Sequence, residues 1–197
     1  MRAVTAIEAP AVAPDDAELL ARLRRGDRGA MDELFRRYRA AAFRVAYRLL
    51  GHEADALDAV QNAFIKVFTH LDGFEGRSSF KTWLLRVVSN AALDVGRRRG
   101  RQDERRDEFA VDAEPEAPAA DEEPGRELER ADLRRLLDQA LQQLPEAQRK
   151  TFVLHVDGGL SYREVADVLG ISIGTVMSRL FYARQKLRAL LSQRCPK

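Results

Sequence analysis

The stretch of chain after Gly170 combines hydroxyl, guanidinium and aromatic side chains at the spacing of a helix. Its apolar residues recur every three or four positions, which predicts an amphipathic helix with one buried face. The groups expected on the opposite face are Ser172, Thr175, Ser178, Arg179 and Tyr182. Because hydroxyl and guanidinium groups form hydrogen bonds with base edges and phosphates, this face suits contact with DNA.

The residues just before this helix predict that it is the second half of a helix-turn-helix. Ser161 and Glu164 have the spacing of a capping box, in which each side chain satisfies a backbone N–H at the start of a helix. Gly170 can end that helix and Ser172 can cap the next, which leaves only a short turn. The alternative is a solvated basic helix in an ordinary bundle. The cap, the short turn and the lack of acids after position 172 favour the DNA-binding motif.

A second candidate site lies in residues 80–101, where aromatic side chains come first and arginines follow. Such a combination suits single-stranded nucleic acid, whose bases stack on aromatic rings while cations hold the backbone. Trp83 at helical spacing is equally consistent with a core position, and the arginines with a solvated face. Composition alone therefore leaves DNA contact by this segment open.

Charge is distributed unevenly along the chain, although its formal net charge is only +2. Residues 86–106 hold seven arginines and three acids, residues 107–126 hold eight acids and one arginine, and residues 173–194 hold five basic groups and no acid. Two basic segments thus flank an acidic spacer. A polyanion can engage both basic segments while the spacer stays away from it.

Helical periodicity predicts an all-α protein, because no alternating strand pattern is present. Asp15 and Glu18 can cap a first short helix that ends at Gly26. Apolar stripes then predict four helices with inward faces, over residues 30–49, 57–71, 83–95 and 133–144, and Pro145 opens the next one. In residues 57–71, Leu57 is the first residue expected to face inward.

Several classes of protein are disfavoured by the sequence. No apolar run reaches the roughly 18 residues of a membrane span, and residues 1–14 lack a secretory signal, so a cytoplasmic protein without membrane insertion is expected. Cys195 is the only cysteine, which excludes an internal disulfide. The histidines are scattered, and neither a metal-ligand spacing nor a nucleophile–base arrangement is present. We therefore expect no enzyme activity, metal or cofactor.

Taken together, these segments closely resemble an extracytoplasmic-function (ECF) sigma factor of the sigma-70 family of bacterial RNA polymerase sigma factors. The resemblance covers residues 15–191 and is most specific in residues 144–149, 159–166, 169–176 and 178–184. The first half adds residues 58–66, 74–76 and 80–84, followed by Asn90 and Asp94.

The resemblance implies two small helical domains, a four-helix sigma-2 domain and a helix-turn-helix sigma-4 domain, joined by a flexible acidic linker. The implied boundaries are a disordered N-terminal extension at 1–14, the sigma-2-like domain at 15–101, the linker at 102–126 and the sigma-4-like domain at 127–194.

The resemblance also implies two sites in the first domain. The residues implied to bind the β′ clamp helices of core RNA polymerase are Asp55, Asp58, Gln61, Asn62 and Lys66. The residues implied to bind and help melt the −10 element are Phe74, Arg77, Ser78, Ser79, Lys81, Trp83, Arg86, Asn90, Arg97, Arg98 and Arg99. Residues 74–79 correspond to a loop that captures a flipped base, and Asn90 to a position that lines its pocket.

The second domain is implied to dock on the β flap and to bind the −35 element of promoter DNA. The residues implied to contact this element are Ser172, Thr175, Met177, Ser178, Arg179, Phe181, Tyr182 and Arg184. Two of them depart from the family pattern, because Met177 and Tyr182 stand where relatives often carry a basic residue. The −35 sequence preference therefore cannot be transferred from the family.

The expected function is that of a sigma factor that brings core polymerase to promoters, helps to open them and is held inactive by an anti-sigma factor. One alternative is a repressor or activator that acts without polymerase, which would leave residues 80–101 without a role. Another alternative, an enzyme fused to a DNA-binding tail, lacks a catalytic constellation.

Overall fold

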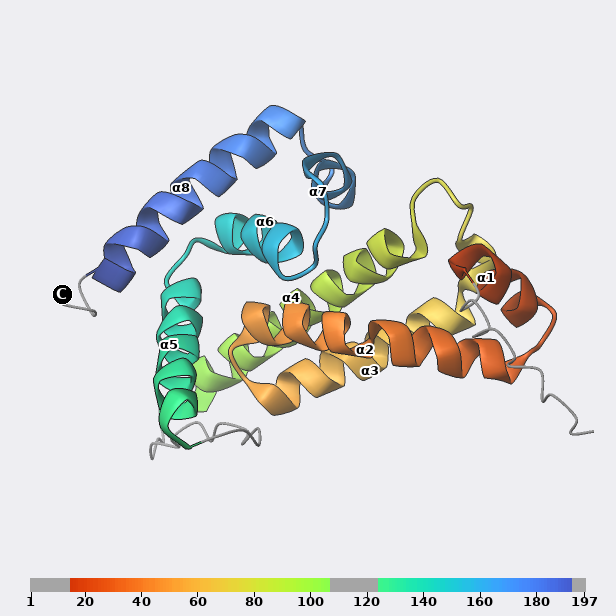
Figure 1. The fold of residues 1–197 in the computed structure, drawn as a ribbon, viewed down its shortest axis with the longest axis horizontal. Coiled ribbons are helices and arrows are strands. Elements are labelled where there is room, and N and C mark those ends of the chain that lie inside the picture. Colours follow the sequence, from red (N-terminus) through yellow and green to blue (C-terminus); the bar gives the residue numbers. More distant parts are fainter. Residues whose placement is uncertain (1–14, 107–123, 193–197) are drawn as a thin grey trace, which may run out of the picture. The chain divides into compact units, whose positions relative to one another are not determined.

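The computed structural model describes residues 15–106 and 124–192, and these residues form only helices and their connections. The elements in chain order are α1 (Asp16–Arg24), α2 (Arg28–Leu50), α3 (Glu53–Thr69), a short 3-10 helix η1 (Leu71–Gly73), α4 (Phe80–Arg106), α5 (Pro124–Gln142), α6 (Glu146–Val156), α7 (Tyr162–Leu169) and α8 (Ile173–Ser192) (Figure 1). The predicted all-α class is confirmed. Residues 102–106 and 124–126 of the predicted linker are helical. The predicted N-terminal extension, linker residues 107–123 and residues 193–197 lie outside the described residues.

The described residues up to Arg37 form one compact unit, made of α1 and the first half of α2. Asp15 Oδ1 accepts a hydrogen bond from the Glu18 backbone N–H at 2.7 Å, which confirms the predicted cap of α1. Arg37 on α2 forms an ion pair with Asp16 on α1 across 2.7 Å. The ion pair therefore ties the two helices of this unit together across the turn that separates them.

A second unit contains the described residues from Tyr38 onwards, and its largest helix–helix contact is between α3 and α4. Apolar side chains of both helices are buried, among them Val60 and Phe64 on α3 and Leu84 and Val88 on α4. The prediction that Leu57 faces inward is wrong, because its side chain is 54% exposed. Ala56 and Ala59 take the buried positions of that turn, and Leu57, about 100° further round the helix, points outward.

The helices after the acidic segment share a smaller apolar cluster. Its buried members come from the end of α5, from the connection to α6 and from the second half of α8, and they are Ala140, Leu141, Leu144, Ala183 and Leu187. Pro145 precedes α6 as predicted, since proline is compatible with a helix start and disrupts the interior of one. The axes of α7 and α8 meet at 103° across a short break, which is the crossing of a helix-turn-helix (Figure 1).

Among the described residues, no single helix has both the length and the apolar character needed to cross a membrane. The bent pair of α7 and α8 reaches that length and composition only when the two helices are taken together.

Candidate nucleic-acid interface

Local hydrogen bonds fix the start and end of α7. The Ser161 backbone N–H donates to Glu164 Oε2 at 2.9 Å, and the Glu164 backbone N–H donates to the Ser161 hydroxyl at 3.3 Å, so the predicted capping box is present. At the other end, Gly170 has a φ of 64°, a left-handed conformation that side chains disfavour. The Ile171 backbone N–H then donates to the Ala166 carbonyl at 3.1 Å, which turns the chain sharply toward α8.

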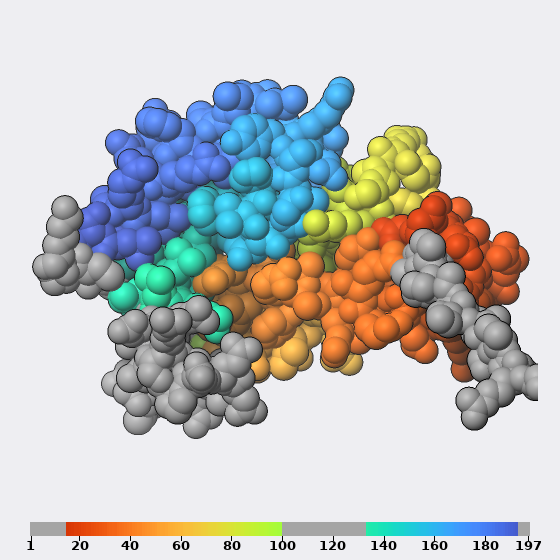
Figure 2. All heavy atoms as spheres, viewed as in Figure 1, coloured from red at the N-terminus to blue at the C-terminus, as the bar shows by residue number. Residues whose placement is uncertain are grey.

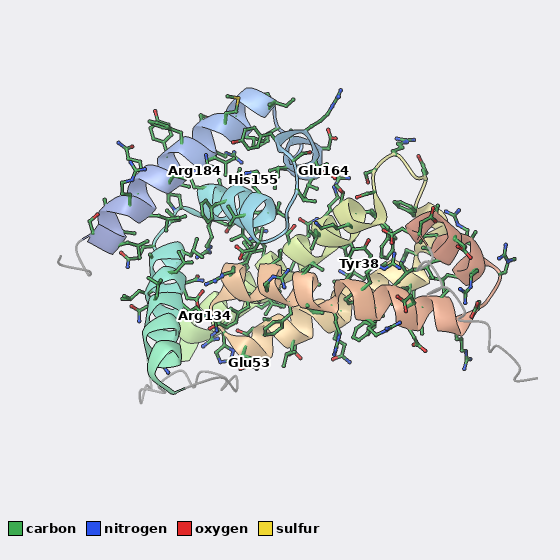
Figure 3. The ribbon with its side chains drawn as sticks, in the orientation of Figure 1. Tyr38, Glu53, Arg134, His155, Glu164 and Arg184 are labelled. Carbon is green, nitrogen blue, oxygen red and sulfur yellow. The ribbon has the colours of Figure 1, made fainter. Side chains whose placement is uncertain are left out.

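Helix α6 supports this turn from the other side. His155 Nδ1 donates to the Leu160 carbonyl at 2.8 Å, and the His155 ring packs edge-on against Tyr162 with centroids 4.9 Å apart. His155 and Glu164 are labelled in Figure 3. His155 therefore has a structural role and positions the first helix of the motif.

The two faces of α8 separate as the sequence predicts. The Thr175 backbone N–H donates to the Ser172 hydroxyl at 3.1 Å, which caps the helix, while Val176, Leu180 and Ala183 are buried. The predicted −35 residues lie at the surface, where the α8 side chains are visible in Figure 2. Exposed members are Ser172, Met177, Ser178, Phe181, Tyr182 and Arg184, and half-buried members are Thr175 and Arg179.

The charge of α8 is concentrated in its second half. Arg179 is the only charged residue between Ile173 and Tyr182, whereas Arg184, Lys186 and Arg188 follow within the next six positions and are exposed. Arg184 extends from α8 in Figure 3. An end with a single charge that can enter a groove and a cationic end that can hold phosphates are the parts that a recognition helix needs.

At the start of α4, three aromatic rings pack together beside the predicted base-capture loop. Phe74 lies 5.0 Å from Trp83 and 6.2 Å from Phe80, measured between ring centroids. Phe74 is only 8% exposed, so in this conformation its ring anchors the loop. The Thr82 backbone N–H donates to the Ser79 hydroxyl at 3.1 Å, so Ser79 caps the start of α4.

The loop itself, between η1 and α4, presents small and charged groups. Arg77 forms an ion pair with Glu75, and Gly76 between them has a φ of 71°. The other predicted −10 residues are placed along α4 and just before it. Exposed ones are Ser79, Arg86, Asn90, Arg97, Arg98 and Arg99, and half-buried ones are Ser78, Lys81 and Trp83.

Several predicted DNA-binding groups have partners within the chain. Lys150 on α6 donates its ammonium hydrogen to Asn90 Oδ1 at 2.9 Å. Arg86 donates to the Asp167 backbone carbonyl, and Arg97 lies 3.4 Å from a Glu146 carboxylate oxygen. Burial lowers the pKa of Lys150. Sequence reasoning missed Lys150, because nothing local to position 150 indicates a partner sixty residues earlier.

The predicted polymerase-binding residues lie on α3, but one of them already forms an ion pair within the chain. Asp55 is half-buried and forms an ion pair with Arg99 at 2.8 Å, so two predicted sites share one contact. The exposed members of the set are Asp58, Gln61, Asn62 and Lys66. Leu57 and Ile65, each more than half exposed, lie four positions before and after Gln61, so the face is more apolar than the sequence suggested.

Within residues 15–106 and 124–192, no group of three or more histidine, cysteine or acidic side chains is arranged to hold a metal ion.

Two family models match the chain in the segments that hold these surfaces. The model of sigma-70 region 2 matches residues 34–102, and that of sigma-70 region 4 matches residues 134–187. Together they cover more than half of the chain. The first segment contains every predicted polymerase-binding and −10 residue, and the second contains every predicted −35 residue.

Curated relatives extend the match over most of the chain. The chain is 38% identical to the ECF RNA polymerase sigma factor SigE of Mycolicibacterium smegmatis, with 85% of this chain and 65% of that protein covered. It is 36% identical to the RNA polymerase sigma-H factor of Pseudomonas aeruginosa and 35% identical to the ECF RNA polymerase sigma-E factor of Escherichia coli K12. In both of these, 87% of this chain and more than nine tenths of the relative are covered. The chain belongs to the ECF sigma factors of the sigma-70 family.

Solved structures of similar proteins agree with this membership. CnrH in complex with the cytosolic domain of CnrY has a TM-score of 0.68 and 28% identity, with 91% of this chain and 99% of that chain covered. The sigma factor RpoE in complex with the anti-sigma factor NepR from Bartonella quintana has a TM-score of 0.66 and 27% identity, with 82% and 96% covered. The fold of this sigma factor is therefore that of its family.

Proposed function

We propose that this sigma factor binds core RNA polymerase, directs it to promoters and helps to open their −10 region, without catalysis of its own. The exposed face of α3 binds the β′ clamp helices, and the sigma-4-like domain docks on the β flap. The start of α4 and the preceding loop hold the unpaired −10 strand, and α8 enters the major groove of the −35 element. These events take place in the cytoplasm, with residues 15–101 and 127–194 acting as the two functional domains.

The observation that supports this proposal most strongly is the pairing of two different nucleic-acid surfaces in one chain. The helix-turn-helix presents a recognition helix whose only charged residue before position 184 is Arg179. The α4 surface combines an aromatic cluster with exposed arginines at positions 86, 97, 98 and 99. A repressor would need the first surface only, whereas promoter opening needs both, since a melted strand must be held while duplex DNA fixes the register.

The internal contacts of the α4 surface imply an order of events. Asn90 is hydrogen-bonded to Lys150, and Arg86 to the Asp167 carbonyl. Both contacts must break before these groups can meet a DNA strand. We expect binding to core polymerase to precede strand capture, because docking the two domains on separate polymerase surfaces would free these side chains.

A partner that holds the factor inactive belongs to the same proposal. Both structural neighbours were solved with a second protein, which is named an anti-sigma factor in the case of NepR. We propose that the present chain is likewise bound by a protein inhibitor, which competes with core polymerase for the sigma factor. The exposed apolar and amide groups of α3 offer a surface on which such competition can occur.

The test is transcription with purified components. The full chain is added to core polymerase and a pool of genomic promoter fragments, and bound polymerase and run-off transcripts are measured together. The proposal predicts stable association with core polymerase and transcripts from a defined subset of promoters. Binding of DNA without association with polymerase would instead support a repressor or activator, and association without promoter selection would also overturn the proposal.

A further inference from the structure

Three exposed apolar side chains form a row along the outer face of α8. Ile173, Met177 and Phe181 are spaced by four residues each, and they are 45%, 55% and 62% exposed. Side chains four apart lie on the same side of a helix, so the three form one continuous strip. Tyr182 adjoins the strip, with its ring edge-on to that of Phe181 at a centroid distance of 5.4 Å. The sequence patterns did not single out Ile173.

The polar groups of this half of α8 are largely engaged within the helix. The Ser172 hydroxyl caps the helix and lies 2.9 Å from the Thr175 hydroxyl, and the Ser178 hydroxyl donates to the Thr175 carbonyl at 3.0 Å. Arg179, the only charged residue of this half, is half-buried. The apolar strip is therefore the main feature that this end of α8 presents to a ligand.

We propose that this strip recognises thymine bases of the −35 element through their 5-methyl groups. The inference rests on the proposed function, in which α8 enters the major groove, and it names the base chemistry used there. In the major groove a thymine presents a methyl group that apolar side chains can contact, and cytosine presents none. Met177 and Phe181 make the main contacts with the methyl groups, and Ile173 lies at the end of the strip nearest the turn.

The charge around the strip favours DNA over a protein partner. The three exposed cations Arg184, Lys186 and Arg188 follow the strip on the same helix, and α8 contains no acidic residue. A polyanion satisfies both the strip and these cations, because phosphates flank every base that the strip could touch. A protein partner would have to supply an apolar groove bordered by acids instead.

The length of the strip fits a short run of base pairs. Positions 173 and 181 are separated by about 12 Å along the helix axis, since each residue rises about 1.5 Å. Stacked base pairs follow one another at about 3.4 Å, so the strip can cover about three or four of them. We therefore expect methyl recognition at two or three neighbouring positions.

The test replaces thymine by deoxyuridine, which differs only by the missing methyl group. Holoenzyme assembled from the full chain and core polymerase first selects its preferred −35 sequence from a randomised duplex pool. Each thymine of that sequence is then exchanged singly for deoxyuridine, and affinity is measured by competition. We expect about a fourfold loss at each contacted position, which is the effect of one buried methyl group. Deoxyuridine placed in the spacer between the −35 and −10 elements should have no effect.

Two variants assign the effect to the strip. Met177→Arg should abolish the penalty of at least one deoxyuridine and increase the salt dependence of binding by about one ion, since it adds a phosphate-binding cation. Leu133→Ala is the matched control, because Leu133 is 56% exposed but lies on α5, away from this face. It should leave the deoxyuridine penalties unchanged.

The possible results separate this inference from the proposed function. If holoenzyme selects a −35 sequence but deoxyuridine is tolerated at every position, or if the selected sequence contains no thymine, methyl recognition is wrong and the sigma factor function stands. If Met177→Arg retains every penalty, the strip is not the contact and the inference is likewise overturned. If no holoenzyme forms, both proposals fail together.

Discussion

Thr82 donates its hydroxyl hydrogen to Glu164 Oε1 at 2.6 Å, although 82 positions separate the two residues in the chain. Thr82 is buried at the start of α4, and Glu164 closes the capping box of α7. One carboxylate thus accepts hydrogen bonds from Thr82 and from the Ser161 backbone N–H and hydroxyl. These donors lower the pKa of Glu164 below its ordinary value, with the Thr82 hydroxyl as the largest cause.

The first prediction concerns the pH dependence of stability. Because the pKa of Glu164 is lower in the folded chain than in the unfolded one, its ionised form stabilises the fold above the ordinary value of 4.5, and this contribution is lost as pH falls below it. Glu164→Gln removes the titration but keeps a residue that can complete a capping box. The difference in unfolding free energy between the two proteins should be larger at pH 7 than at pH 3.5 in urea titrations.

Glu75→Gln is the control for this experiment, because Glu75 is an exposed loop residue that caps no helix. A difference between wild type and Glu164→Gln that stays constant from pH 7 to pH 3.5 would show that the hydrogen bonds of the carboxylate do not stabilise the fold.

The second prediction compares two glycines on either side of the turn between α7 and α8. A methyl group at Gly170 would meet no atom within 4 Å, but the φ of 64° makes Gly170→Ala unfavourable by about 1–2 kcal/mol. Gly174 is in the first turn of α8, and a methyl group there would meet only Ser172 Oγ at 3.8 Å. Gly174→Ala should therefore stabilise the protein by about 0.5 kcal/mol. If urea unfolding shows that both variants are stabilised or that both are destabilised, the backbone conformation described for this turn is wrong.

The third prediction concerns the proposed strand capture by Asn90. Asn90→Ala should reduce open-complex formation about tenfold, corresponding to the loss of one or two hydrogen bonds to an unpaired base. Binding to core polymerase should stay nearly intact, because Asn90 lies on α4 and not on the proposed docking face of α3. Permanganate footprinting measures opening, and fluorescence anisotropy measures binding to core polymerase. An equal loss in the two assays would remove Asn90 from the strand-capture site.

The fourth prediction concerns docking on polymerase through α3. Leu57→Ser and Ile65→Ser should each weaken binding to core polymerase about tenfold or more, since burying such an apolar side chain against a partner contributes about 1.5–3 kcal/mol. Stability should change by less than about 0.5 kcal/mol, because both side chains are already solvent-exposed in the free protein.

Val156→Ser is the matched control for these two variants, because Val156 is 52% exposed and lies on α6. Normal affinity of Leu57→Ser and Ile65→Ser for core polymerase would place the docking surface elsewhere.

The local features of this protein could be predicted from its sequence. The caps at Asp15, Ser79 and Ser161 and the left-handed glycine at position 170 depend on hydrogen bonds and steric limits within a few residues. Helical periodicity likewise predicted the all-α fold and the buried face of α8. The exposure of Leu57 was mispredicted, because the neighbouring alanines and not the larger side chain occupy the buried side of α3.

Contacts between distant residues were decided only by the tertiary structure. Three such contacts join residues that are more than forty positions apart in the sequence. They are the hydrogen bonds of Asn90 with Lys150 and of Thr82 with Glu164, and the ion pair of Asp55 with Arg99. These contacts form only where packed helices bring two side chains within about 3 Å of each other. Helical periodicity predicts which face of a helix a residue lies on, but not distances between side chains on different helices. The sequence by itself determined that the chain is helical and where several helices begin and end, whereas packing decided which apolar residues of α3 are buried and which polar groups remain exposed.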